Sequence, residues 1–304
     1  LSAGLSFFLP MVDTVPQRDC AGRILRLDRP QVMGIVNVTP DSFSDGGAHD
    51  TTDAAVAHAL RLVEEGADVL DIGGESTRPG SPAGPLGEEL ARVLPGVREA
   101  GTLGVPSSVD SYKPEVMAQV LDLGVDIVND IWGLRRASAS GGPSALDVVR
   151  SHPACGVCLM HMHGDPQTMQ VAPMEGDAVP QVLLFLEQAA QSLQAQGVNK
   201  SRIVLDPGIG FGKTLAQNFA LLPRQAELLV AGFPLLIGWS RKSSIGKALQ
   251  ADAPEPPPPG ERLVGSVAAA LMAAERGASI LRVHDVRETV QALQVLAQVR
   301  ACAA

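Results

Sequence analysis

The chain has few aromatic residues, few cysteines and no excess of positive charge. Only 3% of its 304 residues are Phe, Trp or Tyr, and its four cysteines are scattered, at Cys20, Cys155, Cys158 and Cys302. So few cysteines exclude a disulfide framework and indicate a reducing, cytoplasmic compartment. The formal net charge of −9 argues against nucleic acid as a partner, because that partner would require a strong local basic patch.

Long apolar runs are also missing. The longest stay short of the roughly 20 residues that a membrane helix requires, so no membrane partner is expected. The N-terminal LSAGLSFFLPMV is apolar, but it lacks a basic start and a small-residue cleavage site, so we do not expect a signal peptide. What is present is 45% hydrophobic and 19% charged residues, typical of a globular protein with a core of Ala, Val and Leu.

Eight short, β-branched apolar runs alternate with helical patterns along the chain. The runs begin at residues 32, 68, 105, 126, 156, 202, 233 and 279. The first helical pattern opens with a Thr/Asp cap at 51–53 and ends at Gly66, and another has Pro114 in its first turn. Repeated strand–helix units predict a single (β/α)8 TIM barrel over residues 31–304, with residues 1–30 as an N-terminal extension.

Polar residues follow the predicted strands, where barrels of this kind place their active sites. They are Asn37, Asp71, Asp110, Asn129, His161, Asp206, Ser240 with Lys242, and Arg282 with His284. An open, doubly wound sheet would gather its polar residues at one crevice, so this spread favours the barrel. The polar, Gly- and Pro-rich segments 39–47 and 73–85 are interpreted as active-site loops, with plain connectors as the alternative.

Two groups of strand-end residues predict two parts of a ligand. Arg282 and His284 lie two positions apart, so both leave one face of a strand, and a guanidinium beside an imidazole suits a phosphate. Asp110, Asn129 and Asp206 converge on the barrel axis. Buried carboxylates without cation partners require a ligand with several N–H donors, such as a flat heterocycle with an amino-amidine edge.

Lys242 and the turn that follows it predict further ligand contacts. The ammonium group of Lys242 can donate to a carbonyl or a nitrogen of the ring. Backbone N–H groups of the turn, together with Ser243, can bind a carboxylate. The Pro-rich APEPPPPGE near residue 255 is interpreted as a surface connection without chemistry.

The segment DPGIGFGKT, residues 206–214, is similar to a phosphate-binding P-loop but fails its spacing. A P-loop requires a glycine five positions before Gly212, and that position holds Pro207. The glycines are therefore interpreted as allowing close approach of the backbone around a planar ligand, with Phe211 as an apolar contact.

A metal site formed by Cys155, Cys158, His161 and His163 is not favoured. These residues are of ligand type and lie close together in the sequence. However, Cys155 and Cys158 would face opposite sides of a strand, so they could not hold one ion together.

Nine motifs resemble those of one enzyme family. In chain order they are MGIVNVTPDSFSDGG, DIGGESTRPG, SVDSYKPEV, IVNDI, LMHMHGDPQTMQ, DPGIGFGKT, GWSRKSSIG, ERLVGSVAAAL and RVHDV, between Met33 and Leu296. Together they resemble the dihydropteroate synthase family. The resemblance implies a folate-pathway enzyme that joins (7,8-dihydropterin-6-yl)methyl diphosphate to 4-aminobenzoate and releases diphosphate. It also implies Mg²⁺ as cofactor, a homodimer, and sulfonamides as inhibitors.

The resemblance implies a role for each matching residue. Asn37 resembles the Mg²⁺ ligand, and Arg282 with His284 resembles the diphosphate clamp. The residues that resemble the pterin pocket and its catalytic groups are Asp110, Asn129, Asp206 and Lys242, with Met160 and Phe211 as apolar walls and Thr77 as a further contact of the pterin diphosphate. The residues that resemble the aminobenzoate site are Phe43, Asp45, Thr77, Arg78, Pro79 and Ser243.

The chemistry implied is a dissociative substitution, in which diphosphate leaves first and the aminobenzoate nitrogen then attacks. Three alternatives remain. A pterin-dependent methyltransferase would share the Asp/Asn pocket but has no use for ESTRPG or the Arg282/His284 clamp. A catalytically silent pterin-binding paralogue would carry substitutions in the two loops, and we see none. A metal-dependent hydrolase is the third.

Overall fold

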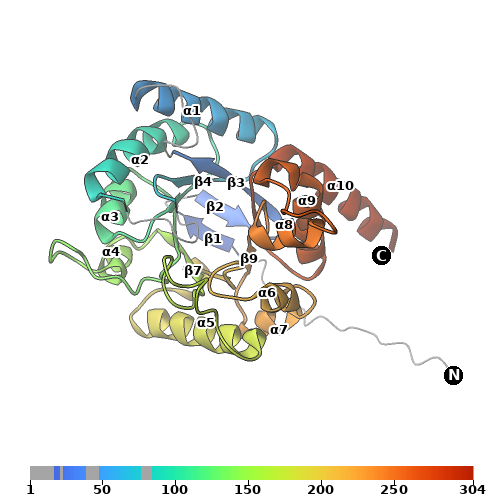
Figure 1. The fold of residues 1–304 in the computed structure, drawn as a ribbon. Helices are drawn as coiled ribbons and strands as arrows, with labels where there is room; N and C mark the ends of the chain where they lie inside the picture. Colours follow the sequence, from blue (N-terminus) through green and yellow to red (C-terminus); the bar gives the residue numbers. More distant parts are fainter. Residues whose placement is uncertain (1–16, 21–22, 39–47, 77–83, 304) are drawn as a thin grey trace.

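Eight parallel strands form a barrel at the centre of the computed structural model, which describes residues 17–20, 23–38, 48–76 and 84–303 (Figure 1). In the order of their hydrogen-bonded neighbours they are β8 (Ile203–Asp206), β7 (Gly156–Met160), β6 (Ile127–Asp130), β5 (Ser107–Asp110), β4 (Val69–Gly73), β3 (Gln31–Asn37), β10 (Ile280–Val283) and β9 (Leu236–Ile237). The backbone N–H of Leu205 donates to Pro234 O at 3.0 Å, which joins β8 to the residues before β9. The predicted (β/α)8 barrel is confirmed.

Helices follow the strands and cover the outer face of the barrel (Figure 1). In chain order they are α1 (Ala48–Glu64), α2 (Leu86–Ala100), α3 (Pro114–Asp122), α4 (Ala145–Ser151), α5 (Ala178–Ala195), α6 (Leu215–Leu221), α7 (Gln225–Leu228), α8 (Ser243–Leu249), α9 (Leu263–Glu275) and α10 (Val286–Ala303). Short 3-10 helices lie at Lys200–Arg202, Leu229–Ala231 and Pro259–Glu261. Within the described ranges, no helix has the length and apolar character required to cross a membrane.

The predicted helix boundaries are partly right. Helix α3 begins at Pro114, and α1 ends at Glu64 just before Gly66, whose φ of 100° suits a glycine after a helix. The predicted start of α1 at 51–53 is wrong, because the helix begins at Ala48. Thr and Asp cost only about 0.7 kcal/mol inside a helix, so their presence does not prevent the helix from extending beyond them.

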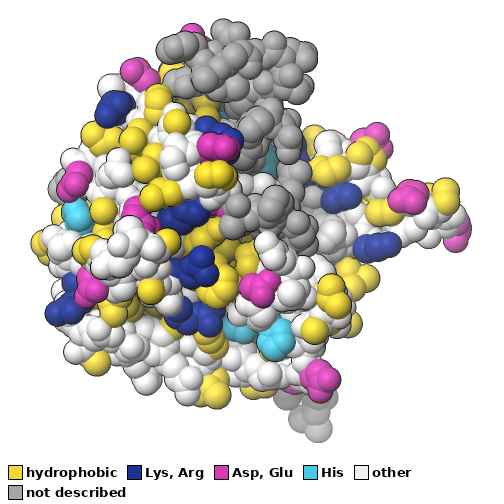
Figure 2. All heavy atoms as spheres, turned by 60° about the vertical axis from the view of Figure 1, so that its left-hand side comes forward, with side chains coloured by type: hydrophobic (Ala, Val, Ile, Leu, Met, Phe, Trp, Pro, Cys, Tyr) yellow, Lys and Arg dark blue, Asp and Glu magenta, His cyan; other side chains and the backbone are white. Residues whose placement is uncertain are grey.

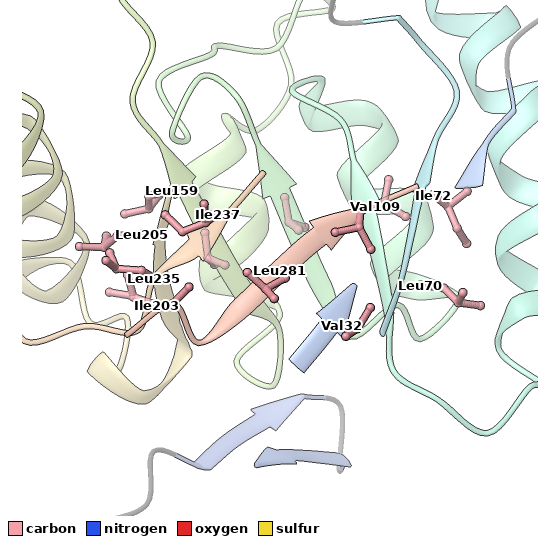
Figure 3. Close-up of a cluster of buried hydrophobic side chains, with 14 of the residues drawn as sticks. Val32, Leu70, Ile72, Val109, Leu159, Ile203, Leu205, Leu235, Ile237 and Leu281 are labelled. Carbon is pink, nitrogen blue, oxygen red and sulfur yellow. The ribbon is translucent and has the colours of Figure 1, made fainter. Parts of the chain in front are cut away.

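The strands are buried on both faces. An apolar layer fills the barrel interior near the N-terminal ends of the strands, and it contains Met33, Val69, Ile127, Cys158, Val204, Leu236 and Ile280. Neighbouring residues on the same strands, such as Val32, Leu70 and Val109, pack towards the helices (Figure 3). Burial on both faces explains why these strands read as nearly continuous apolar runs in the sequence.

An antiparallel hairpin lies at the end of the barrel opposite the polar strand ends (Figure 3). Its strands are β1 (Gln17–Cys20) and β2 (Arg23–Arg26), which pair with each other. Leu25 is 4% exposed and packs with the apolar layer of the barrel interior. Part of the segment predicted as an extension therefore covers the N-terminal ends of the barrel strands.

The Pro-rich segment near residue 255 joins α8 to α9, and residues 251–255 are exposed. Arg262 fixes its end, because the side chain donates to Pro257 O at 2.8 Å and to Arg241 O at 2.9 Å. The segment is thus tied to the residues before α8.

Candidate active site

A layer of polar side chains lies inside the barrel, directly beyond the apolar layer. Side chains alternate along a strand, so the second residue after an apolar interior residue faces the interior again. This step leads from Val69 to Asp71, from Ile127 to Asn129, from Val204 to Asp206 and from Ile280 to Arg282. The strand ends thereby bring most of the predicted pterin and phosphate residues into one layer.

Arg282 on β10 binds two carboxylates at once. Its Nε donates to Asp71 Oδ2 at 2.6 Å, and its Nη2 donates to Asp110 Oδ2 at 2.8 Å. The prediction that Asp110 lacks a cation partner is therefore wrong. Arg282 is 172 residues away in the sequence and reaches Asp110 from another strand, which no local pattern indicates.

Asp71 also accepts a hydrogen bond from Asn129. The amide nitrogen Nδ2 of Asn129 lies 3.1 Å from Asp71 Oδ2. Asp71 is 0% exposed and Asn129 5%. In the sequence, Asp71 is one of the polar strand-end residues, but no role is predicted for it. The signal for its place in the site is its position two residues after an apolar interior residue.

Asp206 and Lys242 both contact the glycine-rich turn after β8. Asp206 Oδ1 accepts from Gly208 N at 2.7 Å, and Lys242 Nζ donates to Ile209 O. The ammonium group of Lys242 lies 5.1 Å from the centre of the Phe211 ring. Phe211 packs on a buried apolar cluster that also contains the other predicted pocket wall, Met160.

The glycines of DPGIGFGKT allow close contact with the backbone after β7. A Cβ on Gly208 would lie 1.9 Å from His161 O, and one on Gly212 would lie 2.3 Å from His163 O. Both glycines also have positive φ, at 66° and 67°. The interpretation that the glycines make room for a planar ligand is therefore wrong for Gly208 and Gly212, since the residues after β7 occupy that space.

The Gly-Lys-Thr end of this segment is structural as well. Lys213 is 2% exposed, and its Nζ donates to Gly208 O at 2.8 Å and lies 2.9 Å from His161 Nδ1. Thr214 is the N-cap of α6, where it forms a capping box with Gln217. The lysine thus fixes the turn from inside, which agrees with the rejection of a P-loop.

His284 lies just beyond the end of β10, two residues after Arg282. Its Nδ1 lies 3.0 Å from Ser240 Oγ, and its backbone N–H donates to the same oxygen at 3.1 Å. The structure therefore places Arg282 and His284 near each other at the rim, but with different partners. Ser243 is exposed at the first position of α8.

Burial and neighbouring charges move the pKa values of these groups. Burial raises the pKa of Asp110 to about 7; the charge of Arg282 lowers this pKa, whereas the negative charge of Asp71 adds to the rise. Burial lowers the pKa of Lys242 to about 8, against the attraction of Asp206. Burial also raises the pKa of Asp206. For Arg282, burial lowers the pKa, but Asp71 and Asp110 outweigh it and the pKa is raised.

The end of β3 carries residues that suit Mg²⁺. A Cβ built on Gly73 would lie 4.0 Å from Asn37 Oδ1 and 3.6 Å from Asp110 Cβ, so the two side chains share one neighbourhood. Among the described residues, the buried oxygen Asp110 Oδ1 has no hydrogen-bond partner. Amide and carboxylate oxygens are the ligands that Mg²⁺ prefers, so these residues fit the ion.

In the described ranges, no group of three or more His, Cys, Asp or Glu side chains lies close enough together to hold a metal ion. Cys158 belongs to the apolar layer inside the barrel, whereas Cys155 belongs to the core between the strands and the helices. The prediction that these two cysteines face opposite sides is confirmed.

Five predicted residues lie outside the described ranges. They are Phe43 and Asp45 in the first predicted loop and Thr77, Arg78 and Pro79 in the second. Their assignment to the aminobenzoate site stays a prediction.

Lys113, three residues after Asp110, forms a network that the sequence did not reveal. Its Nζ donates to Glu89 Oε2 at 2.7 Å, to Gly84 O at 2.7 Å and to Glu75 Oε2. The backbone N–H of Gly84 donates to Glu75 Oε1 at 3.0 Å. Glu75 and Gly84 flank residues 77–83, so Lys113 holds both ends of the segment that carries part of the predicted aminobenzoate site.

Positive side chains gather beside hydrophobic ones near the middle of one face of the molecule (Figure 2).

The barrel with its polar layer matches the family model described as "Pterin binding enzyme" over residues 33–284. This range includes every barrel strand except the first two residues of β3. The chain belongs to the pterin-binding enzyme family.

Comparison with known relatives narrows the assignment of the chain within this family. A dihydropteroate synthase from Escherichia coli is 48% identical over 277 residues, covering 90% of this chain and 93% of its own. The structure is similar to that of Xanthomonas albilineans dihydropteroate synthase with 4-aminobenzoic acid, at 51% identity and a TM-score of 0.86, over 95% of this chain and 99% of that one. It is also similar to Burkholderia cenocepacia dihydropteroate synthase complexed with 7,8-dihydropteroate, at 47% identity and a TM-score of 0.82, over 94% and 97% of the chains. Within its family the chain is thus among the dihydropteroate synthases, transferases of folate biosynthesis.

Proposed function

We propose that this chain joins (7,8-dihydropterin-6-yl)methyl diphosphate to 4-aminobenzoate, giving 7,8-dihydropteroate and diphosphate. The observation that carries the proposal is the polar layer, in which Asp110, Asn129 and Asp206 lie with Lys242 and Arg282 at the ends of different strands. Solved relatives at about half identity contain 4-aminobenzoic acid and 7,8-dihydropteroate, which supports the same ligands here.

The polar layer offers one set of side chains for the pterin ring and another for the diphosphate. Carboxylates of Asp110 and Asp206 would accept hydrogen bonds from the N–H groups of the ring, and Lys242 would donate to its carbonyl or nitrogen. Arg282 and His284 would bind the diphosphate. This division explains why a buried layer with three carboxylates, counting Asp71, also contains an arginine.

The geometry favours a dissociative substitution. The bond between the pterin methylene carbon and the diphosphate oxygen breaks, and its electron pair leaves with the diphosphate. The cation that remains is delocalised over the dihydropterin ring, and Asp110 and Asp206 stabilise it. The aminobenzoate nitrogen then forms a bond to the methylene carbon and loses a proton, which the released diphosphate can take up. No side-chain nucleophile takes part in this scheme.

Asn37 is the residue that would hold Mg²⁺, together with diphosphate oxygens. Bound Mg²⁺ would neutralise charge on the leaving diphosphate. The aminobenzoate site would be formed by the predicted loop residues and Ser243. We further propose a cytoplasmic homodimer, which exposed apolar side chains on the last two helices support, namely Val264, Val295 and Val299 at 80%, 65% and 61% exposure.

The test is an assay of diphosphate release from the pterin diphosphate, with Mg²⁺, run with and without 4-aminobenzoate and with the product followed by mass. Product that depends on both substrates would support the synthase. Tight pterin binding without product would indicate a silent paralogue instead. Transfer of a methyl group from a methylated tetrahydrofolate would indicate the methyltransferase.

A further inference from the structure

Asp71 connects two residues that are assigned to different parts of the substrate. Its Oδ2 accepts from Arg282 Nε at 2.6 Å and from Asn129 Nδ2 at 3.1 Å. Under the proposed function, Arg282 binds the diphosphate and Asn129 binds the pterin. Asp71 is 0% exposed, so it lies behind both side chains and not on the surface that a substrate would meet.

Arg282 has a different relation to each of its two carboxylates. Asp71 holds Nε, the nitrogen closest to the backbone, whereas Asp110 holds the terminal Nη2. The side chain of Asp110 is 10% exposed and that of Asp71 is 0% exposed. Asp110 is also the carboxylate that the pterin requires as an acceptor, so it cannot keep all its capacity for Arg282 once the ring is bound.

We infer that Asp71 is a positioning residue for both halves of the pterin diphosphate. It keeps its bond to Arg282 Nε and to Asn129, while Asp110 exchanges Arg282 Nη2 for the pterin ring. The released Nη2 then turns to the diphosphate. Asp71 is the counter-charge that remains with Arg282 after the exchange. This inference rests on the proposed function.

The substitution Asp71→Asn can separate the charge of Asp71 from its role as a hydrogen-bond acceptor. Both partners of Asp71 Oδ2 are donors, and Asp71 Oδ1 has no hydrogen-bond partner among the described residues. An asparagine could therefore present its oxygen to both donors and place its NH₂ group at the Oδ1 position. The substitution Asp71→Asn keeps the shape and the acceptor but removes the charge.

The first experiment is calorimetric titration with inorganic diphosphate, in the presence of saturating 6-hydroxymethylpterin, of the wild type, Asp71→Asn, Arg282→Met and the double variant. We expect Asp71→Asn to weaken diphosphate binding by about tenfold or more. In the Arg282→Met background, Asp71→Asn should cause no further loss, because Asp71 acts on diphosphate through Arg282. Equal losses in both backgrounds, or a loss of less than about twofold in the single variant, would overturn the inference.

A second probe separates the pterin half. Titration with 6-hydroxymethylpterin, which carries no phosphate, should show weaker binding to Asp71→Asn but not to Arg282→Met, because Asp71 also holds Asn129.

The matched control is Asp126→Asn. Asp126 is 1% exposed and lies at the opposite ends of the strands, where it accepts from Ser107 N at 2.8 Å. This variant should lower the melting temperature while leaving both affinities within about twofold; an equal loss of affinity in the control would indicate a general structural effect and overturn the inference.

If Asp71→Asn does not fold, the wild type still tests the inference by ¹H–¹⁵N spectra of the Arg282 Nε–H group, assigned with Arg282→Met. The signal should stay protected from solvent exchange when the pterin and diphosphate are added. Rapid exchange on ligand addition would show that Asp71 releases Nε, contrary to the inference. A wild type that binds neither probe would refute the proposed function itself, whereas binding of both with an unaffected Asp71→Asn variant would refute only the role of Asp71.

Discussion

Replacing Lys113 by methionine should destabilise the fold and weaken 4-aminobenzoate binding more than pterin diphosphate binding. Methionine keeps most of the length of the side chain but removes its charge and its three donors. The carboxylates of Glu75 and Glu89 would then share a buried space without a cation. Gly84 O would lose its partner as well, so both ends of the segment 77–83 would be released together.

The magnitude follows from the burial of the two carboxylates. The side chains of Glu75 and Glu89 are 9% and 2% exposed. Removing one partner from a buried ion pair costs about 3–5 kcal/mol. Burial already raises the pKa of Glu89, so this group can take up a proton after Lys113 is lost, and the lower end of that range is expected. A loss of about 3 kcal/mol corresponds to a fall in Tm of roughly 6 °C for a chain of this size.

Thermal unfolding followed by circular dichroism measures the first effect, and steady-state kinetics with each substrate varied in turn measures the second. We expect a several-fold rise in KM for 4-aminobenzoate and little change in KM for the pterin diphosphate. The control is Lys247→Met, because Lys247 is exposed and, within the described ranges, its side chain forms a single hydrogen bond, to Gln250 at 3.3 Å. A fall in Tm no larger than that of the control, or an equal rise in both KM values, would refute the reasoning.

Three further predictions concern pH, the glycine turn and the charge of Asp206. Asp110 must be ionised and has a pKa of about 7, and Lys242 must be protonated and has a pKa of about 8. Therefore kcat/KM for the pterin diphosphate should rise with pH up to about 7 and fall above about 8, and a flat profile would contradict these roles. In Gly212→Ala the new Cβ lies 2.3 Å from His163 O, so urea titration should show a loss above about 2 kcal/mol. Gly104→Ala, at φ 80° with open space, should lose only about 1 kcal/mol; equal losses in both would contradict the close contact. Asp206→Asn keeps an oxygen for Gly208 N but removes the charge, so kcat should fall by about 100-fold or more, and normal turnover would exclude the dissociative scheme.

The barrel could be predicted because its signals are local. Each strand is a short apolar run bounded by polar or glycine residues, and each is buried on both faces, so the pattern survives in the sequence. The polar layer follows from the same alternation, since Asp206 lies two residues after Val204 and Arg282 two after Ile280. Residue type and strand position were sufficient to place these side chains in one layer.

The partners within the site could not be predicted, because they depend on distances across the barrel. Arg282 meets Asp71 although 211 residues separate them in the sequence. Similarly, the close contact between Gly212 and His163 depends on how two loops pack. A glycine in the sequence does not show whether the space beside it holds a neighbouring backbone or a ligand. Lys113 joins Glu75 and Glu89 because three segments meet near the end of β5: the residues after β4, the first turn of α2 and the start of α3.

The hairpin of β1 and β2 gives the barrel a floor. In the described part of the chain, Leu25 fills the lower end of the interior, so a molecule held by the polar layer can leave only towards the opposite rim. Under the proposed function, an aminobenzoate bound nearer the rim would lie over the pterin, and because the other end of the barrel is closed, its presence would lengthen the time for which the pterin stays bound.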